Sequence, residues 1–168
     1  MWPFSRKRDL PGINREADGR ISFTFTDEEE AEVHKSFASM KGPEEGQGEW
    51  YIHPEAHKAL TAWALIGYSQ TQVWRAERDG VGRLDRRACI ERALAAAGKA
   101  YALHPLPIYM FDMGCLLEML GETPSARDAY ERFLKAQRNF HATELDNIIL
   151  KNRDVATAVQ EARKSLGV

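Results

Sequence analysis

Apolar residues recur at three- and four-residue intervals through most of the chain from His53 onward, which is the spacing that buries one face of a helix. In the stretch 54–78, for example, Leu60, Trp63 and Ile66 are spaced in this way. Polar or glycine-containing breaks divide the pattern into segments. It predicts a first helix at about 54–78 and further helices from Asp85 to His104 and at about 107–120, 124–137, 143–151 and 154–166.

Three of these helices are expected to begin with a proline in the first turn, at Pro54, Pro107 and Pro124. Proline suits that position because its missing N–H group has no partner inside the helix there. Short breaks join the segments, as at 121–123, so consecutive helices should fold back on one another. We therefore expect an all-α domain of antiparallel helical hairpins over 53–168.

The N-terminal third has a different pattern. Residues 1–20 show no helical or strand periodicity, and we expect an irregular tail there. Residues 21–25 alternate apolar and polar side chains like a half-buried strand, for which 50–52 is the plausible partner. A helix should follow from a cap at Thr26 to about Met40. These features make 21–52 an extension before the helical domain.

Small residues at set positions suggest a repeat. Gly114 and Ala126 would allow close approach of two helices, Leu117 would be a core position and Gly121 the turn between them. Ala93, Ala126 and Ala158 lie 33 and 32 residues apart. Together with Tyr130 and with His104-Pro105, which closes the preceding unit, this pattern resembles the tetratricopeptide repeat.

The resemblance implies about three units, the second being the best formed. It implies that Tyr130 packs against the next unit, and that Trp63, Ile66 and Gly67 open the first. Gly67 and Gly114 are 47 residues apart, so the first unit would contain an insertion of about 13 residues relative to the family period. We place this insertion in the extended first helix and the loop 78–85. A generic helical bundle is the alternative, and both are all-α.

Within such a repeat the first helix of each unit lines a concave groove. The resemblance places the first unit's groove residues at 61, 64, 68, 71 and 72, and the second's at 108, 111, 115, 118 and 119. The lysine, asparagine and arginine residues with which some family members grip a C-terminal carboxylate are missing from these positions. We expect an apolar peptide or helix as ligand instead. The candidate partner-binding residues are Tyr68, Thr71, Gln72, Ile108, Phe111, Cys115 and Met119.

The alternative explanation is that Phe111 and Met119 are core residues, as aromatic residues at helical spacing more often are, or are covered by the N-terminal segment, including the helix expected at 27–40. That alternative stays open at this stage.

Candidate chemistry is sparse. The sequence has no nucleophile elbow and no P-loop or dinucleotide-binding glycine pattern. His53 and His57 are four residues apart but lack a third ligand nearby, so we expect no metal site. Cys89 and Cys115 read as small core residues. We expect no catalytic residues and no cofactor, and therefore not an enzyme.

Charge and cysteine content limit the expected partners and cellular location of the protein. A net charge of −2 and a pI near 6.2 give no general attraction to nucleic acid. Two cysteines favour a reduced, cytoplasmic protein, and no stretch reaches the roughly 20 apolar residues of a membrane helix. The start of the chain contains a short aromatic and basic cluster that would make weak contact with an anionic membrane surface. This cluster comprises Trp2, Phe4, Arg6, Lys7 and Arg8.

The sequence thus predicts a non-enzymatic adaptor or scaffold that binds a peptide or helix of a partner protein. A secretion-type chaperone is a specialised version of the same class. Two alternatives come from other classes. One is an enzyme or an accessory subunit with dispersed site residues, and the other is a structural protein that self-associates as a homo-oligomer.

Overall fold

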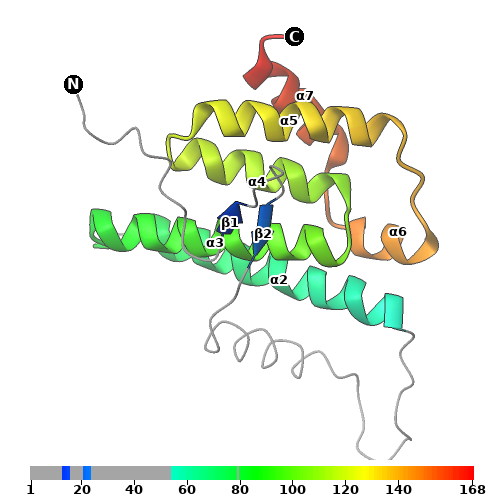
Figure 1. The fold of residues 1–168 in the computed structure, drawn as a ribbon, viewed down its shortest axis with the longest axis horizontal. Coiled ribbons are helices and arrows are strands. Elements are labelled where there is room, and N and C mark those ends of the chain that lie inside the picture. Colours follow the sequence, from blue (N-terminus) through cyan, green and yellow to red (C-terminus); the bar gives the residue numbers. More distant parts are fainter. Residues whose placement is uncertain (1–12, 16–20, 24–53, 79) are drawn as a thin grey trace, which may run out of the picture.

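The computed structural model describes residues 13–15, 21–23, 54–78 and 80–168. This part of the chain is mainly helical (Figure 1). Its helices are α2 (Pro54–Glu77), α3 (Arg83–Leu103), α4 (Pro107–Met119), α5 (Thr123–Arg138), α6 (Glu144–Leu150) and α7 (Val155–Leu166). The all-α expectation is confirmed for this part. No helix in the described ranges is both long enough and apolar enough to cross a membrane.

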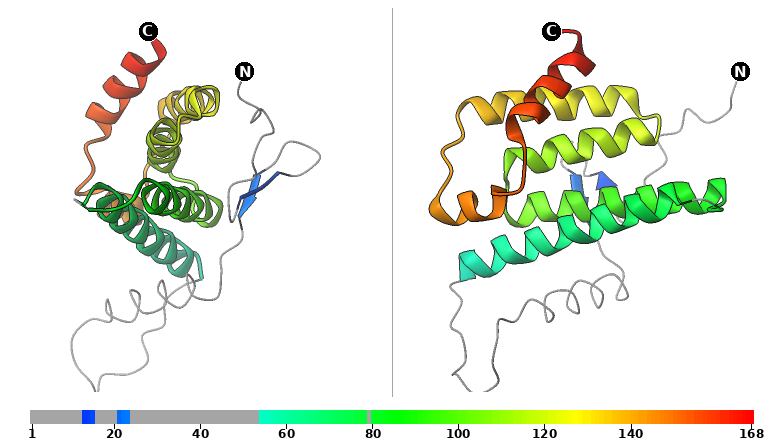
Figure 2. Two further views of the ribbon diagram at one scale, coloured as in Figure 1. Left: turned by 90° about the vertical axis from the view of Figure 1, so that its left-hand side faces the viewer. Right: turned by 180° about the vertical axis from the view of Figure 1, so that it is seen from behind.

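Consecutive helices pack side by side. α2 packs on α3, α3 on α4 and α4 on α5, while α7 lies across α5 and α4 (Figure 2). α2 and α4 share no extensive contact, although both pack on α3. The first four helices run alternately in opposite directions (Figure 1), so α2–α3 and α4–α5 form two hairpins, here called the first and second hairpin.

A short strand pair lies beside the helices. β1 (Ile13–Arg15) and β2 (Ile21–Phe23) are antiparallel, with Arg15 opposite Ile21, and β2 lies against α3 (Figure 2). The strand predicted at 21–25 is therefore paired with β1, inside the stretch expected to be irregular. Its predicted partner at 50–52 and the helix predicted at 26–40 lie outside the described residues.

Most helix ends follow local sequence signals. Prolines stand in the first turns of α4 and α5. Thr143 caps α6 with a reciprocal capping box that includes Asp146, and Asp154 caps α7. The cap predicted at Asp85 is wrong, because α3 begins at Arg83 after Gly82 and has no side-chain cap. Asp85 instead lies in the first turn of that helix.

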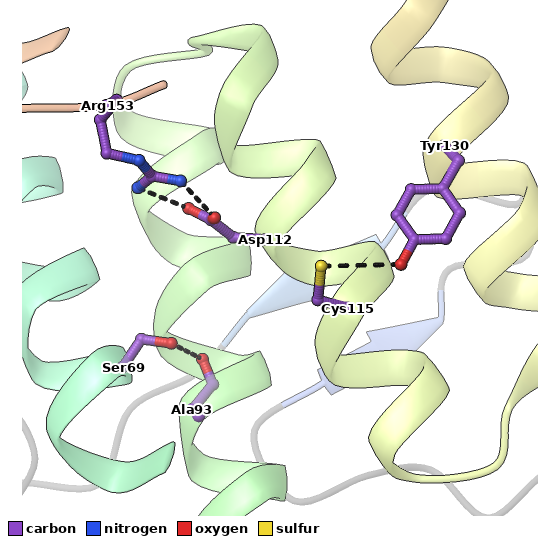
Figure 3. Close-up of polar contacts among 6 residues, drawn as sticks. All are labelled: Ser69, Ala93, Asp112, Cys115, Tyr130 and Arg153. Carbon is purple, nitrogen blue, oxygen red and sulfur yellow. Dashed lines mark hydrogen bonds and ion pairs between the residues drawn. The ribbon is translucent and has the colours of Figure 1, made fainter. Parts of the chain in front are cut away.

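The first hairpin is built from small side chains. α3 is buried on several sides, because its middle segment from Ala93 to Gly98 is completely buried where the helix is packed against both α2 and α4. Ser69 of α2 donates a hydrogen bond to the carbonyl oxygen of Ala93 at 2.8 Å (Figure 3). Because alanine side chains are small, the helix backbones come close together. The interface then consists of many contacts between small groups instead of a few contacts between large side chains.

The second hairpin is built from rings. A methyl group added at Gly114 would lie 2.5 Å from a ring carbon of Tyr130, so that ring occupies the space in front of the glycine. The ring of Phe111 lies 5.7 Å from that of Tyr130 and 5.5 Å from that of Phe133. Gly114 therefore permits close packing, as the sequence predicted. Tyr130, expected against the next unit, makes these contacts within its own hairpin.

The corresponding glycine of the first hairpin plays no such part. Gly67 is exposed, and a methyl group added there would have no neighbouring atom within 4 Å. Trp63, one turn earlier, is 42% exposed. Gly67 therefore does not allow a close helix approach of the kind that Gly114 allows, because it faces open space.

Candidate interaction surface

The most apolar surface element of the described structure is α4. Its thirteen residues include only two charged ones, Asp112 and Glu118. Helices at a protein surface normally bury one apolar stripe and turn a polar face outward, but α4 has no polar face. Its partly buried apolar side chains are Met110, Phe111, Met113, Cys115, Leu117 and Met119.

The groove residues predicted on α2 are mostly buried. Tyr68 is 8% exposed and Gln72 is 1% exposed. Thr71 is exposed, and its hydroxyl donates to the carbonyl oxygen of Gly67 at 3.0 Å, a bond within the helix. Of these three residues only Thr71 presents an open side chain.

The groove residues predicted on α4 divide into two groups. Ile108 is core, at 2% exposed. Phe111, Cys115 and Met119 are partly buried, and Phe111 contributes its ring to the packing against α5. Because α2 and α4 do not pack on each other extensively, the seven predicted residues do not line one continuous surface.

A face of α4 that sequence reasoning missed contains Met110, Met113 and Leu117. These residues are spaced i, i+3 and i+7, so they share one side of the helix, and each is partly buried. The spacing was visible in the sequence, but the repeat pattern assigned Leu117 to the core. Methionine adapts its shape to irregular apolar partners, so this face suits a helix or an extended apolar segment.

Another side of α4 is tied to the C-terminal helices. Arg153, in the turn before α7, donates two hydrogen bonds to the Asp112 carboxylate at 3.0 and 2.5 Å (Figure 3). Burial raises the pKa of Asp112, and the Arg153 guanidinium acts in the opposite direction. A bidentate pair of this kind fixes direction as well as distance, so it orients the α6–α7 turn relative to α4.

A second tie joins the end of α3 to α6. The Nε2 atom of His104 lies 2.7 Å from an Asp146 carboxylate oxygen. Asp146 is 4% exposed and also accepts a hydrogen bond from the backbone N–H of Thr143 at 2.9 Å. Burial favours a higher pKa for Asp146, but the hydrogen bonds from Thr143 and His104 outweigh it and hold the pKa below its ordinary value. The carboxylate is thus fully engaged in holding structure.

Two further polar side chains of α4 are those of Tyr109 and Cys115. Tyr109 is 1% exposed, its hydroxyl makes no hydrogen bond within the described residues, and burial raises its pKa. Burial also raises the pKa of the Cys115 thiol, which accepts a hydrogen bond from the Tyr130 hydroxyl at 3.6 Å (Figure 3). A cysteine with a raised pKa is a poor nucleophile because the thiolate is the reactive form.

The metal candidates fall largely beyond what the structure describes. His53 and the side chain of His57 lie outside the described residues. Among the residues that are described, no three histidine, cysteine, aspartate or glutamate side chains are grouped closely enough to hold a metal ion.

Comparison of the chain with protein-family models, with curated proteins and with solved structures found no match.

Proposed function

We propose that this protein is a non-enzymatic adaptor of the cytoplasm that binds an apolar helix or peptide of a partner protein. In this proposal the hairpins form a short tetratricopeptide-like array, and α4 supplies the binding surface. The observation that carries the proposal is the composition of α4, where charge is limited to Asp112 and Glu118 and the large apolar side chains are only partly buried.

Two observations support the repeat-like arrangement. The Tyr130 ring occupies the space that a side chain at Gly114 would need, and Ala126 is 1% exposed. The resemblance implies small residues at both positions of a unit. Gly67 departs from that pattern. The best-supported unit is therefore the second hairpin, which also contains the proposed surface.

The surface has the chemistry of a helix-binding face. Met110, Met113 and Leu117 supply flexible, apolar contacts along one side of α4. Surfaces that bind amphipathic helices contact apolar side chains that recur at helical spacing along the bound helix. Methionine-rich surfaces can bind several such sequences. The partner should present two or three large apolar residues with little charge between them, since α4 offers few charged groups to pair with.

The test uses site-specific photo-crosslinking in the organism that makes the protein. A photoreactive amino acid at position 113 should yield a discrete crosslinked partner, identified by mass spectrometry. The same amino acid at position 70, on the exposed face of α2, is the positional control and should not capture that partner. The double variant Met113→Lys/Leu117→Lys should reduce recovery of the partner by roughly tenfold or more, because it buries charge in an apolar contact.

Glu131→Lys is the matched control, since it makes the same charge change at an exposed position of α5, outside α4, and should leave recovery unchanged. Thermal unfolding of all variants separates lost binding from lost folding. Equal recovery by a folded Met113→Lys/Leu117→Lys variant would rule out α4 as the binding surface. Crosslinks only to a second copy of the chain would replace the adaptor with a self-associating protein.

A further inference from the structure

The end of the first hairpin projects from the molecule. α2 and α3 have 24 and 21 residues, whereas α4 and α5 have 13 and 16. The turn that joins α2 to α3 therefore extends beyond the second hairpin (Figures 1 and 2). We call residues 74–87 the hairpin tip, of which all but residue 79 are described. This is where the sequence placed the insertion relative to the repeat.

The hairpin tip exposes two large apolar side chains. Trp74 is 60% exposed and Leu84 is 83% exposed. The Arg78 guanidinium lies 5.0 Å from the centre of the Trp74 ring, stacked on one side of it. Leu84 stands in the first turn of α3, where a polar side chain would have served the helix equally well. Neither residue adds much to the folded core in this position, since each leaves most of its surface in water.

The net charge of the hairpin tip is opposite in sign to that of the whole chain. It contains five arginines against three carboxylates, although the full sequence has a net charge of −2. Arg87 is paired with Glu91 at 2.9 Å, but Arg83 and Arg86 form no ion pair within the described residues and both are exposed. Arg83 and Arg86 thus expose their positive charge to solvent at the tip.

These arginines stand where helix stability disfavours them. The N-terminus of a helix has a partial positive charge, so acidic residues stabilise the first turn and basic ones oppose it. The first turn of α3 nevertheless contains Arg83 and Arg86 with a single acidic residue, Asp85, and Gly82 provides no side-chain cap. Where several local stability rules fail together without a structural gain, function is the expected reason.

From these observations we propose that the hairpin tip docks on anionic lipid headgroups at a membrane surface. A projecting tip can approach a flat surface such as a membrane without hindrance from the second hairpin. Tryptophan favours the interface between headgroups and hydrocarbon, and an exposed leucine beside arginines adds apolar insertion to charge attraction. Trp74 alone could also stack on a nucleic-acid base, but the exposed aliphatic Leu84 adds nothing to stacking, so the two side chains together fit a lipid interface better.

This docking is separate from partner binding at α4, so either can fail alone. It would add to any contact by the basic cluster at the start of the chain, which every tip variant below retains.

Flotation of the full-length protein with vesicles tests the proposal. Vesicles of phosphatidylcholine with phosphatidylserine should bind the wild type, and vesicles of phosphatidylcholine alone should bind it weakly. The variant Arg83→Glu/Arg86→Glu should lower the partition coefficient on the anionic vesicles by roughly tenfold or more. Trp74→Ser/Leu84→Ser should lower it by roughly threefold to tenfold while leaving the net charge unchanged.

Lys135→Glu/Arg138→Glu is the matched control, because it makes the same charge change at exposed positions of α5. It should stay within about twofold of the wild type, as its site lies away from the tip. Thermal melts confirm that each variant is folded.

Several results would overturn the proposal. One is binding by the wild type that is equal on both kinds of vesicle or missing from both. Another is an equal loss in the tip and α5 charge variants. Full release of the protein from vesicles by an oligonucleotide or an acidic peptide, with tip-dependent binding to that competitor, would assign the tip to a different partner.

Discussion

The two hairpins contain a glycine at the comparable place in their first helix, yet only one of these glycines is needed for packing. Gly114 leaves room for the Tyr130 ring, whereas Gly67 faces open space. Spacing along the chain places both glycines in helices but does not orient them. Which side of a helix faces its neighbour depends on the whole apolar surface of that helix, and α2 buries a side that excludes Gly67.

The two hairpins also pack through different kinds of side chain. The first relies on alanines such as Ala62, Ala93 and Ala97, each fully buried. The second relies on Phe111, Tyr130 and Phe133. A close-packed alanine interface fixes the distance between two backbones, while interlocked rings concentrate the packing energy in a few residues. The two hairpins should therefore respond differently to substitution.

The largest effect is expected where the rings concentrate. Phe133 is 0% exposed and contacts Phe111, so Phe133→Ala should lower the free energy of unfolding by about 3–5 kcal/mol. Urea denaturation followed by circular dichroism measures the change. Leu84→Ala, at an 83% exposed position of the first hairpin, is the control and should stay within about 0.5 kcal/mol of wild type. A loss at Phe133 no greater than at Leu84 would contradict the ring-centred packing.

The two glycines give a matched pair. Gly114→Ala places a methyl group 2.5 Å from a carbon of Tyr130 and should destabilise the protein by about 1–3 kcal/mol. Gly67→Ala meets no atom and should stabilise it by about 0.5–1 kcal/mol, because alanine loses less backbone entropy in a helix. Urea denaturation compares the two variants directly.

A double variant checks the cause. In Gly114→Ala/Tyr130→Leu the ring is removed, so the added methyl should cost less than in the single variant, and the coupling shows in the double-mutant cycle. Additive effects, or equal signs for the two glycine variants, would show that the hairpins do not differ in this way.

A further effect is expected at the contact between His104, at the end of the first hairpin, and Asp146 of α6. Asp146→Asn should cost about 1–2 kcal/mol near neutral pH, since an uncharged amide accepts weaker hydrogen bonds from His104 and Thr143. The folded state holds the pKa of Asp146 below its ordinary value of 3.8. Its contribution is therefore complete above that pH and disappears as the pH falls through the lowered pKa.

Wild type and variant should accordingly converge in stability as the pH falls below about 3.8, which thermal melts at a series of pH values can follow. Asp112 has a raised pKa, so its protonation works in the opposite direction, and it is present in both proteins. A difference between the two proteins that did not change with pH would show that the Asp146 charge is not what stabilises the tie.

Much of the fold was predictable because its signals are local. The prolines at 54, 107 and 124 are in the first turns of helices, His104 ends α3, and Asp154 caps α7. Each of these residues acts through its own backbone or a neighbour three residues away. The start of α3 was misjudged because Asp85 is a good cap by type, yet Arg83 already lies in the helix.

The proposed interaction surface matches the residues predicted from the sequence only in part. The apolar character of α4 was visible from its composition, and Cys115 and Met119 are partly buried as a surface position allows. Tyr68, Gln72 and Ile108 turned out to be buried. A tyrosine, a glutamine or an isoleucine at helical spacing reads the same whether a neighbouring helix covers it or not, so the sequence could not decide.

The sequence by itself determined which segments are helical, where most of them begin and end, and that α4 lacks a polar face. Only the tertiary structure decided which glycine admits a ring, which predicted groove residues are covered, and that the tip of the first hairpin projects with Trp74 and Leu84 exposed. The physical reason is the distance along the chain over which each effect acts. Helix formation and capping depend on neighbours within about four residues, whereas burial and exposure depend on residues far away along the chain.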